Sequence, residues 1–497
     1  MAKVISKSRF VSGIQCSKKL YYDTYRKDLK PVLSEQKELL FSTGHLIGDL
    51  AQRVFPDGKD ATPSNYYDFS KSINDTKEWI NAGIKTIYEA AFSSDDVLAA
   101  LDILHHTENE RWAIEVKSSS EVKKYHLIDA SLQYWVMNKS GYRPDKFLLM
   151  HINTSYIKNG EINPNELFSI ADITNDVIEN QEWVKTNIDK LKMVLLSEHE
   201  PIIEIGKHCE SPFICDYKHH CWKHIPKQSV FSLYSPRGLD WILYKQGVLK
   251  IIDIPAGTIL NHRQTLQLNG QKNANHHVDF FKIKEFLNEW CFPLFFFDFE
   301  TIFPALPILN GTSPFQQIPF QYSLHIIEKY GSGYSHKEFL AEPNDFIENS
   351  IDPRKKLIEQ MKIDFGENGS IVAYNATFEI TRLKELAIAF PEDQKFIEGI
   401  IGRFVDLLIP FKNGWYYHPE MGASASIKYV LPAIAPEFSY QDLEISNGGD
   451  ASNIFLNMIN KTFKGDEIKV REALKKYCER DTLGMVIIWE ELIKINQ

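Results

Sequence analysis

Hydrophobic and polar residues alternate over short stretches in the first half of the chain, and this alternation predicts β-strands. Residues 112–117 read Trp-Ala-Ile-Glu-Val-Lys. Side chains two apart share one face of a strand, so Glu115 and Lys117 are expected to point the same way. Asp102 lies in an earlier apolar stretch, which the polar turn 105–111 joins to this strand. The pattern predicts a hairpin with two carboxylates and a lysine close together.

A second acidic strand is predicted near residue 295. Residues 295–301 read Phe-Phe-Phe-Asp-Phe-Glu-Thr, so Asp298 and Glu300 share one face while phenylalanines face a core. Burying such an acidic pair is costly unless it binds cations. The remaining elements predicted in this part are paired strands at 319–328 and 334–340, a strand from 371, a helix from about Asn375 and a long helix at 470–495.

The composition is that of an ordinary globular protein with an α/β pattern. The chain has 497 residues, of which 43% are hydrophobic and 25% charged, and a net charge of −10. This length allows two to four domains of about 100–200 residues each. The charge predicts no general affinity for nucleic acid, although a local basic groove is compatible with it. No apolar run approaches the roughly 20 residues of a membrane span, and no signal peptide is recognisable. We therefore expect a cytoplasmic protein without membrane contact.

Four cysteines form a pattern that indicates metal binding. Cys209, Cys215 and Cys221 follow one another with five-residue gaps, and Cys16 lies near the N-terminus. In a reducing compartment such a cluster favours a metal over disulfides. The fourth ligand is either a neighbouring histidine or Cys16. Zinc accepts Cys/His mixtures but usually with gaps of about two to four residues, whereas longer gaps suit an iron–sulfur cube held by four thiolates.

Asp102, Glu115 and Lys117 are the candidate catalytic residues of the first half. Two carboxylates hold a divalent metal, and a lysine orients or deprotonates the attacking water and offsets phosphate charge. The helix that follows carries Gln133. An early cysteine, an Asp…Glu-x-Lys core, a Gln-bearing helix and a late cysteine triplet resemble the iron–sulfur RecB-type PD-(D/E)XK nucleases of the AddB and CRISPR-associated exonuclease groups.

This resemblance implies a restriction-endonuclease-like domain over residues 1–225 with Mg²⁺ or Mn²⁺ on Asp102 and Glu115. It also implies a 4Fe-4S cluster that clamps the two ends of this domain. By resemblance, the cluster ligands are Cys16, Cys209, Cys215 and Cys221.

Three features depart from the pattern of these families. The cysteine triplet lacks their shorter gap, and Met137 stands where they usually carry a tyrosine. His45 lies three residues before Gly48, the position at which many of them place a metal-binding histidine. His45 is either a metal ligand or an ordinary helix histidine.

The second half carries three motifs in order. They are Asp298-x-Glu300 on a strand, Asn-x-x-Phe-Glu379 at a helix start, and Tyr477-x-x-x-Asp481 on one helical face. This order resembles the DEDD exonucleases of DnaQ and RNase D type. The resemblance implies an RNase H-like domain over 290–497 and hydrolysis with two metals from the 3′ end. Asp298, Glu300, Glu379 and Asp481 would hold the ions, and Tyr477 would orient the water. Glu379 replaces the usual aspartate.

Together the two signatures resemble a family of uncharacterised bacterial two-domain proteins, with residues 226–289 as a connecting region. The implied function is a metal-dependent nuclease, with DNA favoured over RNA as substrate, in DNA repair or processing or in defence against phage. Two alternatives stay open at this point. One is a nucleic-acid-binding protein with one or both centres degenerate, and the other is a zinc-stabilised RNA-processing exonuclease.

Overall fold

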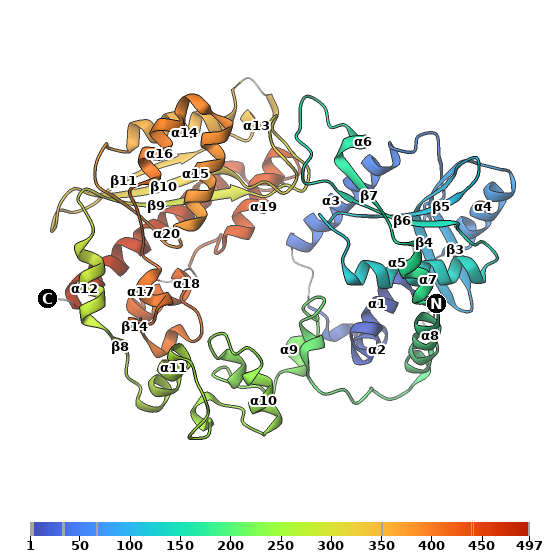
Figure 1. Cartoon of the computed structure of the whole chain (residues 1–497), viewed down its shortest axis with the longest axis horizontal. Coiled ribbons are helices and arrows are strands. Elements are labelled where there is room, and N and C mark those ends of the chain that lie inside the picture. The colour runs from blue at the N-terminus through green and yellow to red at the C-terminus, as the bar shows by residue number, and fades with distance from the viewer. Residues whose placement is uncertain are drawn as a thin grey trace. The chain divides into compact units, whose positions relative to one another are not determined.

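The computed structural model describes residues 4–31, 35–65, 68–348, 351–438, 440 and 442–495. The chain divides into two compact units: unit 1 is Met1–His224 with Ala305–Pro314, and unit 2 is Ile225–Pro304 with Phe315–Gln497. Each unit is a mixed α/β structure around a mixed sheet (Figure 1), so the expected α/β class is confirmed. Residues 226–289, expected to connect two domains, belong to unit 2. No described helix has the length and apolar character needed to cross a membrane.

Unit 1 is built on a seven-stranded sheet in the order β2-β3-β4-β5-β6-β7, with β1 parallel to β4. Neighbouring pairs β3–β4, β4–β5 and β6–β7 are antiparallel, whereas β2–β3 and β5–β6 are parallel. The strands are β1 (Ile5–Ser6), β2 (Lys59–Asp60), β3 (Thr86–Ser94), β4 (Val97–His106), β5 (Arg111–Lys117), β6 (Lys146–Ile152) and β7 (Phe168–Asp172). The helices are α1 (Lys7–Gln15), α2 (Ser17–Tyr25), α3 (Glu35–Gln52), α4 (Ser70–Asn81), α5 (Lys124–Lys139), α6 (Pro164–Leu167), α7 (Thr174–Glu179), α8 (Gln181–Leu196) and α9 (Lys218–Cys221), with short 3₁₀ turns η1 (Lys27–Leu29) and η2 (Lys207–Cys209).

The central helix α5 explains how this unit holds together. It is buried at His126 and from Asp129 to Met137, because it contacts β3 and β4 as well as α1 and α8. A helix that is surrounded in this way belongs inside a domain rather than on its surface. Leu132 and Val136 pack in one core with strand residues such as Leu101 and Phe147.

Unit 2 is built on a five-stranded sheet in the order β11-β10-β9-β12-β13. β10 is antiparallel to both β9 and β11, and β12 is parallel to β9 and β13. The strands are β8 (His277–Val278), β9 (Leu294–Ile302), β10 (Ile318–Ile327), β11 (Ser335–Leu340), β12 (Ser370–Ala373), β13 (Phe404–Asp406) and β14 (Tyr416–Tyr417). The helices are α10 (Leu239–Lys245), α11 (His262–Asn273), α12 (Phe280–Asn288), α13 (Asp345–Glu348), α14 (Pro353–Asp364), α15 (Thr377–Ala389), α16 (Gln394–Ile401), α17 (Ile409–Lys412), α18 (Ile427–Ile434), α19 (Gly448–Ile459) and α20 (Glu467–Ile495), with 3₁₀ turns η3 (Val230–Ser232), η4 (Ile251–Asp253), η5 (Pro391–Asp393) and η6 (Pro419–Met421).

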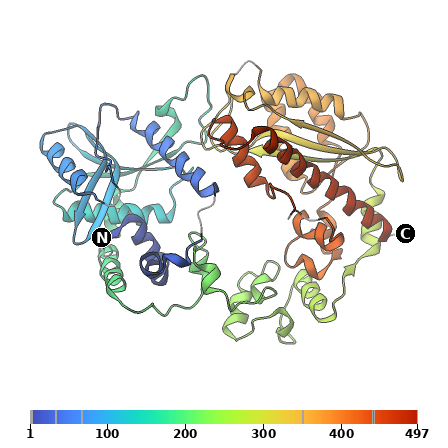
Figure 2. The ribbon, with the colours of Figure 1, turned by 180° about the vertical axis from the view of Figure 1, so that it is seen from behind.

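The aromatic strand β9 has both of its faces covered. Phe295, Phe297 and Phe299 join the core formed with α14, α15 and α16. The alternate positions face the long helix α20, where the Phe296 ring lies 5.9 Å from that of Trp489. Figure 2 shows α20, in dark red, running along the sheet. The two carboxylates of β9 therefore lie on the side of the sheet that α20 covers.

A tight turn places Glu379 beside β9. Asn375 adopts a left-handed conformation with φ of 77°, which asparagine tolerates better than most residues. Asp406 Oδ1 accepts hydrogen bonds from the Asn375 and Leu408 amides at 2.9 and 3.0 Å. The N-cap of α15 is Ala376, so the prediction that the helix starts near Asn375 was early by about two residues, because Asn375 belongs to the turn.

Candidate functional site

Unit 1 brings the predicted Asp102, Glu115 and Lys117 together. Asp102 on β4 accepts a hydrogen bond from the Val116 amide of β5 at 2.6 Å. Glu115 is 1% exposed, and Lys117 Nζ donates to its Oε1 at 2.7 Å. The hairpin register that places these groups follows from the antiparallel pairing of Ile103 with Ile114.

Two residues of this cluster were not predicted from the sequence. Lys7, at the start of α1, donates to both Glu115 carboxylate oxygens at 3.0 and 3.2 Å and to the Ala100 carbonyl at 2.9 Å. Asp129 on α5 accepts from Lys117 Nζ at 2.7 Å. Lys7 precedes Glu115 by 108 positions, and no local pattern marks it. Asp129 lies four residues before Gln133 on the same helix, and this spacing was an available signal.

Burial and charge interactions shift the pKa values of the carboxyl groups in this cluster in opposite directions. Burial, together with the charges of Glu115 and Glu89, raises the pKa of Asp102 well above its usual value. Burial acts in the same direction on Glu115, but ion pairs with Lys117 and Lys7 outweigh it and hold its pKa well below the usual range. Burial raises the pKa of Glu89 to about 7. One carboxylate is thus firmly ionised while two neighbours resist ionisation, an arrangement that an additional cation would relieve.

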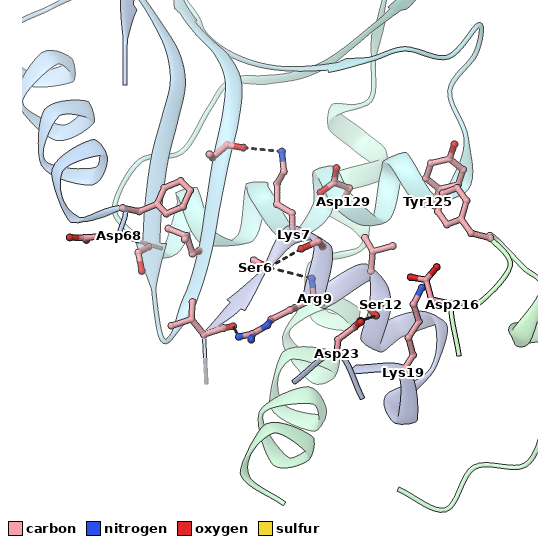
Figure 3. Close-up of a pocket in the computed structure, with 18 of the residues that line it drawn as sticks. Ser6, Lys7, Arg9, Ser12, Lys19, Asp23, Asp68, Tyr125, Asp129 and Asp216 are labelled. Atoms are coloured by element: carbon pink, nitrogen blue, oxygen red, sulfur yellow. Dashed lines mark hydrogen bonds between the residues drawn. The ribbon is translucent and has the colours of Figure 1, made fainter. Parts of the chain in front are cut away.

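A cavity of about 1280 Å³ opens beside this cluster. In Figure 3, Lys7 and Asp129 lie in the upper middle of the view, and Lys19 and Asp216 lie to the right; all four residues line the cavity, as does Arg9. Ser12 on α1 donates to Asp23 on α2 at 2.5 Å, which ties the two helices of the wall together. The cavity is large enough for several atoms of a polymer backbone, and its basic residues suit an anionic ligand.

The Gln-bearing helix also presents unsatisfied polar atoms. Gln133 is completely buried, and neither its amide oxygen nor its amide nitrogen has a hydrogen-bond partner among the described residues. The same is true of Asp129 Oδ1. Such orphaned atoms are uncommon in folded proteins and indicate a missing water, ion or ligand. His45 is exposed on α3, and Met137 is fully buried in the core.

The four predicted metal-binding cysteines line one small cavity of unit 1. Cys16 lies between α1 and α2, and the triplet lies on the loop that follows α8. Burial raises the pKa of the Cys215 thiol to about 11, and the nearby Cys16 and Cys209 thiols add to this effect. Gln15 Nε2 anchors the triplet loop by donating to the His208 and Phe213 carbonyls at 2.9 and 2.6 Å. Four convergent thiols fit a metal cluster and exclude water from it.

Unit 2 gathers the four predicted carboxylates from two helices and one strand. Asp298 and Glu300 project from β9, Glu379 from the first turn of α15, and Asp481 from α20. Burial raises the pKa of Asp298 well above its usual value, and the charges of Asp481, Glu379 and Glu300 raise it further. Burial and the charge of Asp481 act in the same way on Glu300. The side chains therefore lie close enough to repel one another.

Burial also raises the pKa values of Glu379 and Asp481. Burial, with a contribution from Asp406, raises the pKa of Glu379 to about 8, and its Oε2 has no partner among the described residues. Burial raises the pKa of Asp481 to about 6 although hydrogen bonds from Tyr440 and Tyr477 favour the charged form. A divalent cation is the simplest ligand that removes such repulsion.

Tyr477 and Lys428 complete this site. Burial and the charges of Asp481 and Glu300 raise the pKa of Tyr477 far above its usual value, so its hydroxyl stays protonated. The Lys428 ammonium lies 5.3 and 5.5 Å from the ring centroids of Tyr477 and Tyr440 and donates to the Ser446 carbonyl at 2.8 Å. Its charge favours ionisation of Asp298, Glu300 and Asp481.

Three further residues beside this site escaped prediction. Tyr440 donates to Asp481 Oδ1 at 2.5 Å. A Cβ on Gly448, the first residue of α19, would lie 3.3 Å from Glu300 Oε2. Cys478 Sγ approaches the Asp298 carbonyl at 3.9 Å. Cys478 is buried, and its position between two motif residues of α20 was the available signal.

Comparisons with known proteins identify relatives without a described activity. A family model described as a domain of unknown function, DUF2779, matches residues 295–426, a segment that contains three of the four carboxylates of unit 2. The uncharacterized protein MG366 of Mycoplasma genitalium is 32% identical over 222 residues, which is 40% of this chain and 32% of the relative. The uncharacterized protein UU173 of Ureaplasma parvum is 30% identical over 220 residues, which is 39% of this chain and 30% of the relative. The matched regions thus span about a third of these relatives.

Proposed function

We propose that this chain is a metal-dependent nuclease that hydrolyses phosphodiester bonds, with its better-supported centre in unit 2. The observation that carries the proposal is the group of four carboxylates, three buried and Asp298 half-buried. Burial raises the pKa values of all four, and repulsion within the group adds to this at Asp298 and Glu300. Such a group is costly in a folded protein. A pair of Mg²⁺ or Mn²⁺ ions removes that cost, and when bound stabilises both the attacking and the leaving oxygen of a phosphodiester.

The residues around the carboxylates suit this reaction. Tyr477 keeps its proton and hydrogen-bonds to Asp481. Once a cation takes up the Asp481 charge, the same hydroxyl would be able to donate to the attacking water or to a phosphate oxygen. Lys428 supplies a positive charge next to the same group. Gly448 leaves room beside Glu300 at the N-terminus of a twelve-residue helix. Attack from the 3′ end is taken from the resemblance to DEDD exonucleases.

Unit 1 is proposed as a second nuclease centre of the PD-(D/E)XK type. Asp102 and Glu115 would hold one divalent ion, and Lys117 would act on the water. Its carboxylates differ from those of unit 2 because Lys7 and Lys117 already neutralise Glu115. A metal must therefore compete with Lys7, and this centre is expected to bind divalent ions more weakly than the centre of unit 2.

The cysteine cavity supports a proposed 4Fe-4S cluster in unit 1. The donor set fits this group, because four thiols line one cavity and α1, α2 and the triplet loop surround it. The cluster would be structural, joining the first and last segments of the unit. Zinc on the same residues is the alternative, and the two differ in colour and in iron and sulfide content.

DNA is the proposed substrate, with RNA as the alternative. The test is a panel of labelled single- and double-stranded DNA and RNA, assayed with Mg²⁺, with Mn²⁺ and in EDTA. Wild type is compared with Asp298→Ala and Lys117→Ala, each of which removes one centre. We expect Asp298→Ala to abolish most cleavage. The double variant Asp298→Ala, Lys117→Ala should lose any activity that Asp298→Ala alone retains.

Matched controls carry exposed substitutions in each unit. Glu367→Gln changes a carboxylate between α14 and β12, and Lys185→Ala changes a lysine on α8. Both are expected to cleave like wild type. Equal cleavage of every substrate by wild type and the Asp298→Ala, Lys117→Ala double variant would refute the proposal, and binding without cleavage by wild type would favour a nucleic-acid-binding protein.

A further inference from the structure

Two histidines and a glutamate form a group in unit 2 that the proposed nuclease centre does not use. His325 on β10 and His336 on β11 are direct cross-strand partners, and their ring centroids lie 4.5 Å apart. Glu479 comes from α20, which packs against both strands. One potential ligand atom from each of the three residues lies within 4.8 Å of the others.

The hydrogen bonds around the two imidazoles decide which ring nitrogens remain free. When the Thr482 hydroxyl donates to the Glu479 carbonyl, which lies 3.1 Å away, Ser323 is the donor in its 2.7 Å contact with Thr482. His325 Nδ1 lies 2.8 Å from Thr482 Oγ1. Since the Thr482 proton is already used, His325 Nδ1 carries the proton of that bond.

The same reasoning applies to the second ring. His336 Nε2 lies 2.9 Å from Ser323 Oγ, whose proton goes to Thr482, so His336 Nε2 also donates. The lone pairs therefore remain on His325 Nε2 and His336 Nδ1. A ligating histidine typically donates its other ring N–H to a fixed oxygen in this manner, which sets the tautomer and the ring orientation.

One of these lone pairs is buried without a partner. His325 is 0% exposed, and its Nε2 has no hydrogen bond within the part of the chain that the structure describes. Burial, with the neighbouring His336, lowers the pKa of His325 to about 3, so the ring is neutral at physiological pH. A buried acceptor of this kind costs free energy unless a cation or a donor meets it. His336 and Glu479 are half-buried, which leaves a path for an ion to enter.

We propose that His325, His336 and Glu479 bind a divalent transition metal of the zinc class. Two imidazoles and a carboxylate suit zinc, whereas Mg²⁺ and Ca²⁺ prefer oxygen ligands. The ion would join α20 to the hairpin β10–β11. Glu479 lies between Tyr477 and Asp481 on that helix, so the site would also hold these two residues in register. The proposal does not depend on nuclease activity.

The test measures zinc bound by the full chain. EDTA-treated wild type, His336→Gln and Glu479→Gln are dialysed against buffered Zn²⁺ and analysed for metal content and melting temperature. Both substituted side chains are half-buried, and each variant should melt like wild type in EDTA. We expect each to bind about one equivalent of zinc fewer than wild type and to lose the matching zinc-induced rise in melting temperature.

Two of the three controls change residues outside every proposed metal site. His199→Gln changes an exposed histidine and Glu490→Gln an exposed glutamate of α20, and both should bind zinc like wild type. Asp298→Asn should retain this equivalent as well, because it alters only the acidic centre. An unchanged zinc content and an unchanged zinc-induced stabilisation in His336→Gln and Glu479→Gln would overturn the site.

Discussion

At the scale of single residues, Tyr477 and Tyr440 both hydrogen-bond to Asp481, but we assign them different roles. Tyr440 donates to Asp481 Oδ1 at 2.5 Å and thereby fixes a proposed metal ligand. Tyr477 lies one helical turn before Asp481. Burial and the charges of Asp481, Glu300 and Asp298 raise its pKa. The Tyr477 hydroxyl also hydrogen-bonds to Asp481, and we assign it to a water or a phosphate oxygen when a metal neutralises Asp481.

We expect Tyr477→Phe to lower kcat by roughly 10²-fold, the scale of a lost proton-transfer or water-orienting group, with little change in Mn²⁺ affinity. Tyr440→Phe should instead weaken Mn²⁺ binding, because Asp481 loses its donor. Steady-state kinetics and Mn²⁺ titration separate the two. Equal loss of metal affinity in both variants would contradict the role given to Tyr477.

Lys7 gives a second prediction at this scale. It pairs with Glu115, which is almost fully buried. Removing one partner of a fully buried pair typically costs about 3–5 kcal/mol, but Lys117 remains paired with Glu115 in this variant. We therefore expect Lys7→Met to lower the free energy of unfolding in EDTA by less than about 3 kcal/mol, and Mn²⁺ to recover part of it by replacing the lost cation. Lys185→Ala should show neither effect. Denaturant unfolding with and without Mn²⁺ measures both.

These residues also mark the limits of prediction from the sequence. The Asp-x-Glu, Glu-x-Lys and Tyr-x-x-x-Asp motifs are local, so periodicity alone placed Glu115 with Lys117 and Tyr477 with Asp481. Lys7, Lys428 and Tyr440 reach their sites through the tertiary fold, over separations that no helical or strand period encodes. The group His325, His336 and Glu479 was missed for the same reason, because it joins a cross-strand pair to a helix.

At the scale of elements, the strands and long helices were the most predictable parts. The strand predicted at 319–328 is β10 (Ile318–Ile327), and the helix predicted at 470–495 is α20 (Glu467–Ile495). Strong alternation or a long amphipathic run specifies such elements. The polar residues 269–277 are typical of a loop, but α11 extends through their first part to Asn273. Its capping box at Asn261 and Gln264 starts a helix whose polar residues then find partners.

The link between α1 and α2 gives a prediction for the cysteine cluster. Cys16 joins this pair of helices to the triplet loop only if a metal group bridges them. We expect Cys16→Ser to lose most of its bound iron and inorganic sulfide and to lower the melting temperature, since metal binding contributes to folding. Cys291→Ser, at an exposed position of unit 2, should keep both. Anaerobic purification with iron, sulfide and zinc analysis provides the measurement, and stoichiometric zinc in a colourless wild type would contradict the iron–sulfur assignment.

The packing of α14 against η5 gives a pH prediction. Asp393 is buried and accepts from Lys355 and Lys362 at 2.5 and 2.6 Å. Burial opposes ionisation, but these hydrogen bonds prevail and lower the pKa of Asp393. A carboxyl whose pKa is lowered by folding stabilises the protein above its unfolded pKa of about 3.9, and this contribution disappears as the pH falls through the lowered value.

Asp393→Asn should therefore lower the free energy of unfolding at pH 7 by about 1–3 kcal/mol, the range for hydrogen bonds to charged groups. The difference from wild type should shrink below pH 4. Urea unfolding at pH 7 and at low pH, with Glu367→Gln as control, gives the comparison. A difference that stays constant across this range would show that the ion pairs contribute nothing.

At the scale of the whole molecule, two proposed centres lie in separate compact units, so each can be inactivated without removing the ligands of the other.

The division into units was only partly predictable. Residues 226–289 carry no catalytic motif, yet they belong to unit 2, where Arg263 donates to the Phe411 and Lys412 carbonyls at 2.6 and 3.0 Å. The short segment Ala305–Pro314 belongs to unit 1, where the Lys158 amide donates to the Thr312 carbonyl and the Gly311 amide donates to the Lys158 carbonyl. Neither assignment follows from a sequence pattern.

The polarity of digestion is best tested in a protein that retains one centre. In Lys117→Ala, cleavage should depend on the four carboxylates of unit 2, and the proposed attack begins at a free 3′ end. A 3′-blocked, 5′-labelled oligonucleotide should therefore resist this variant at least about tenfold more than the same strand with a free 3′ hydroxyl, since the terminal group must enter the site. Asp298→Ala should digest both strands equally or not at all, because its remaining centre has no assigned end preference. Equal digestion of blocked and free strands by Lys117→Ala would refute the 3′-to-5′ assignment. Hydrolysis at the carboxylates of unit 2 would remain compatible with that result. Their raised pKa values favour cation binding and carry no information on the direction of digestion.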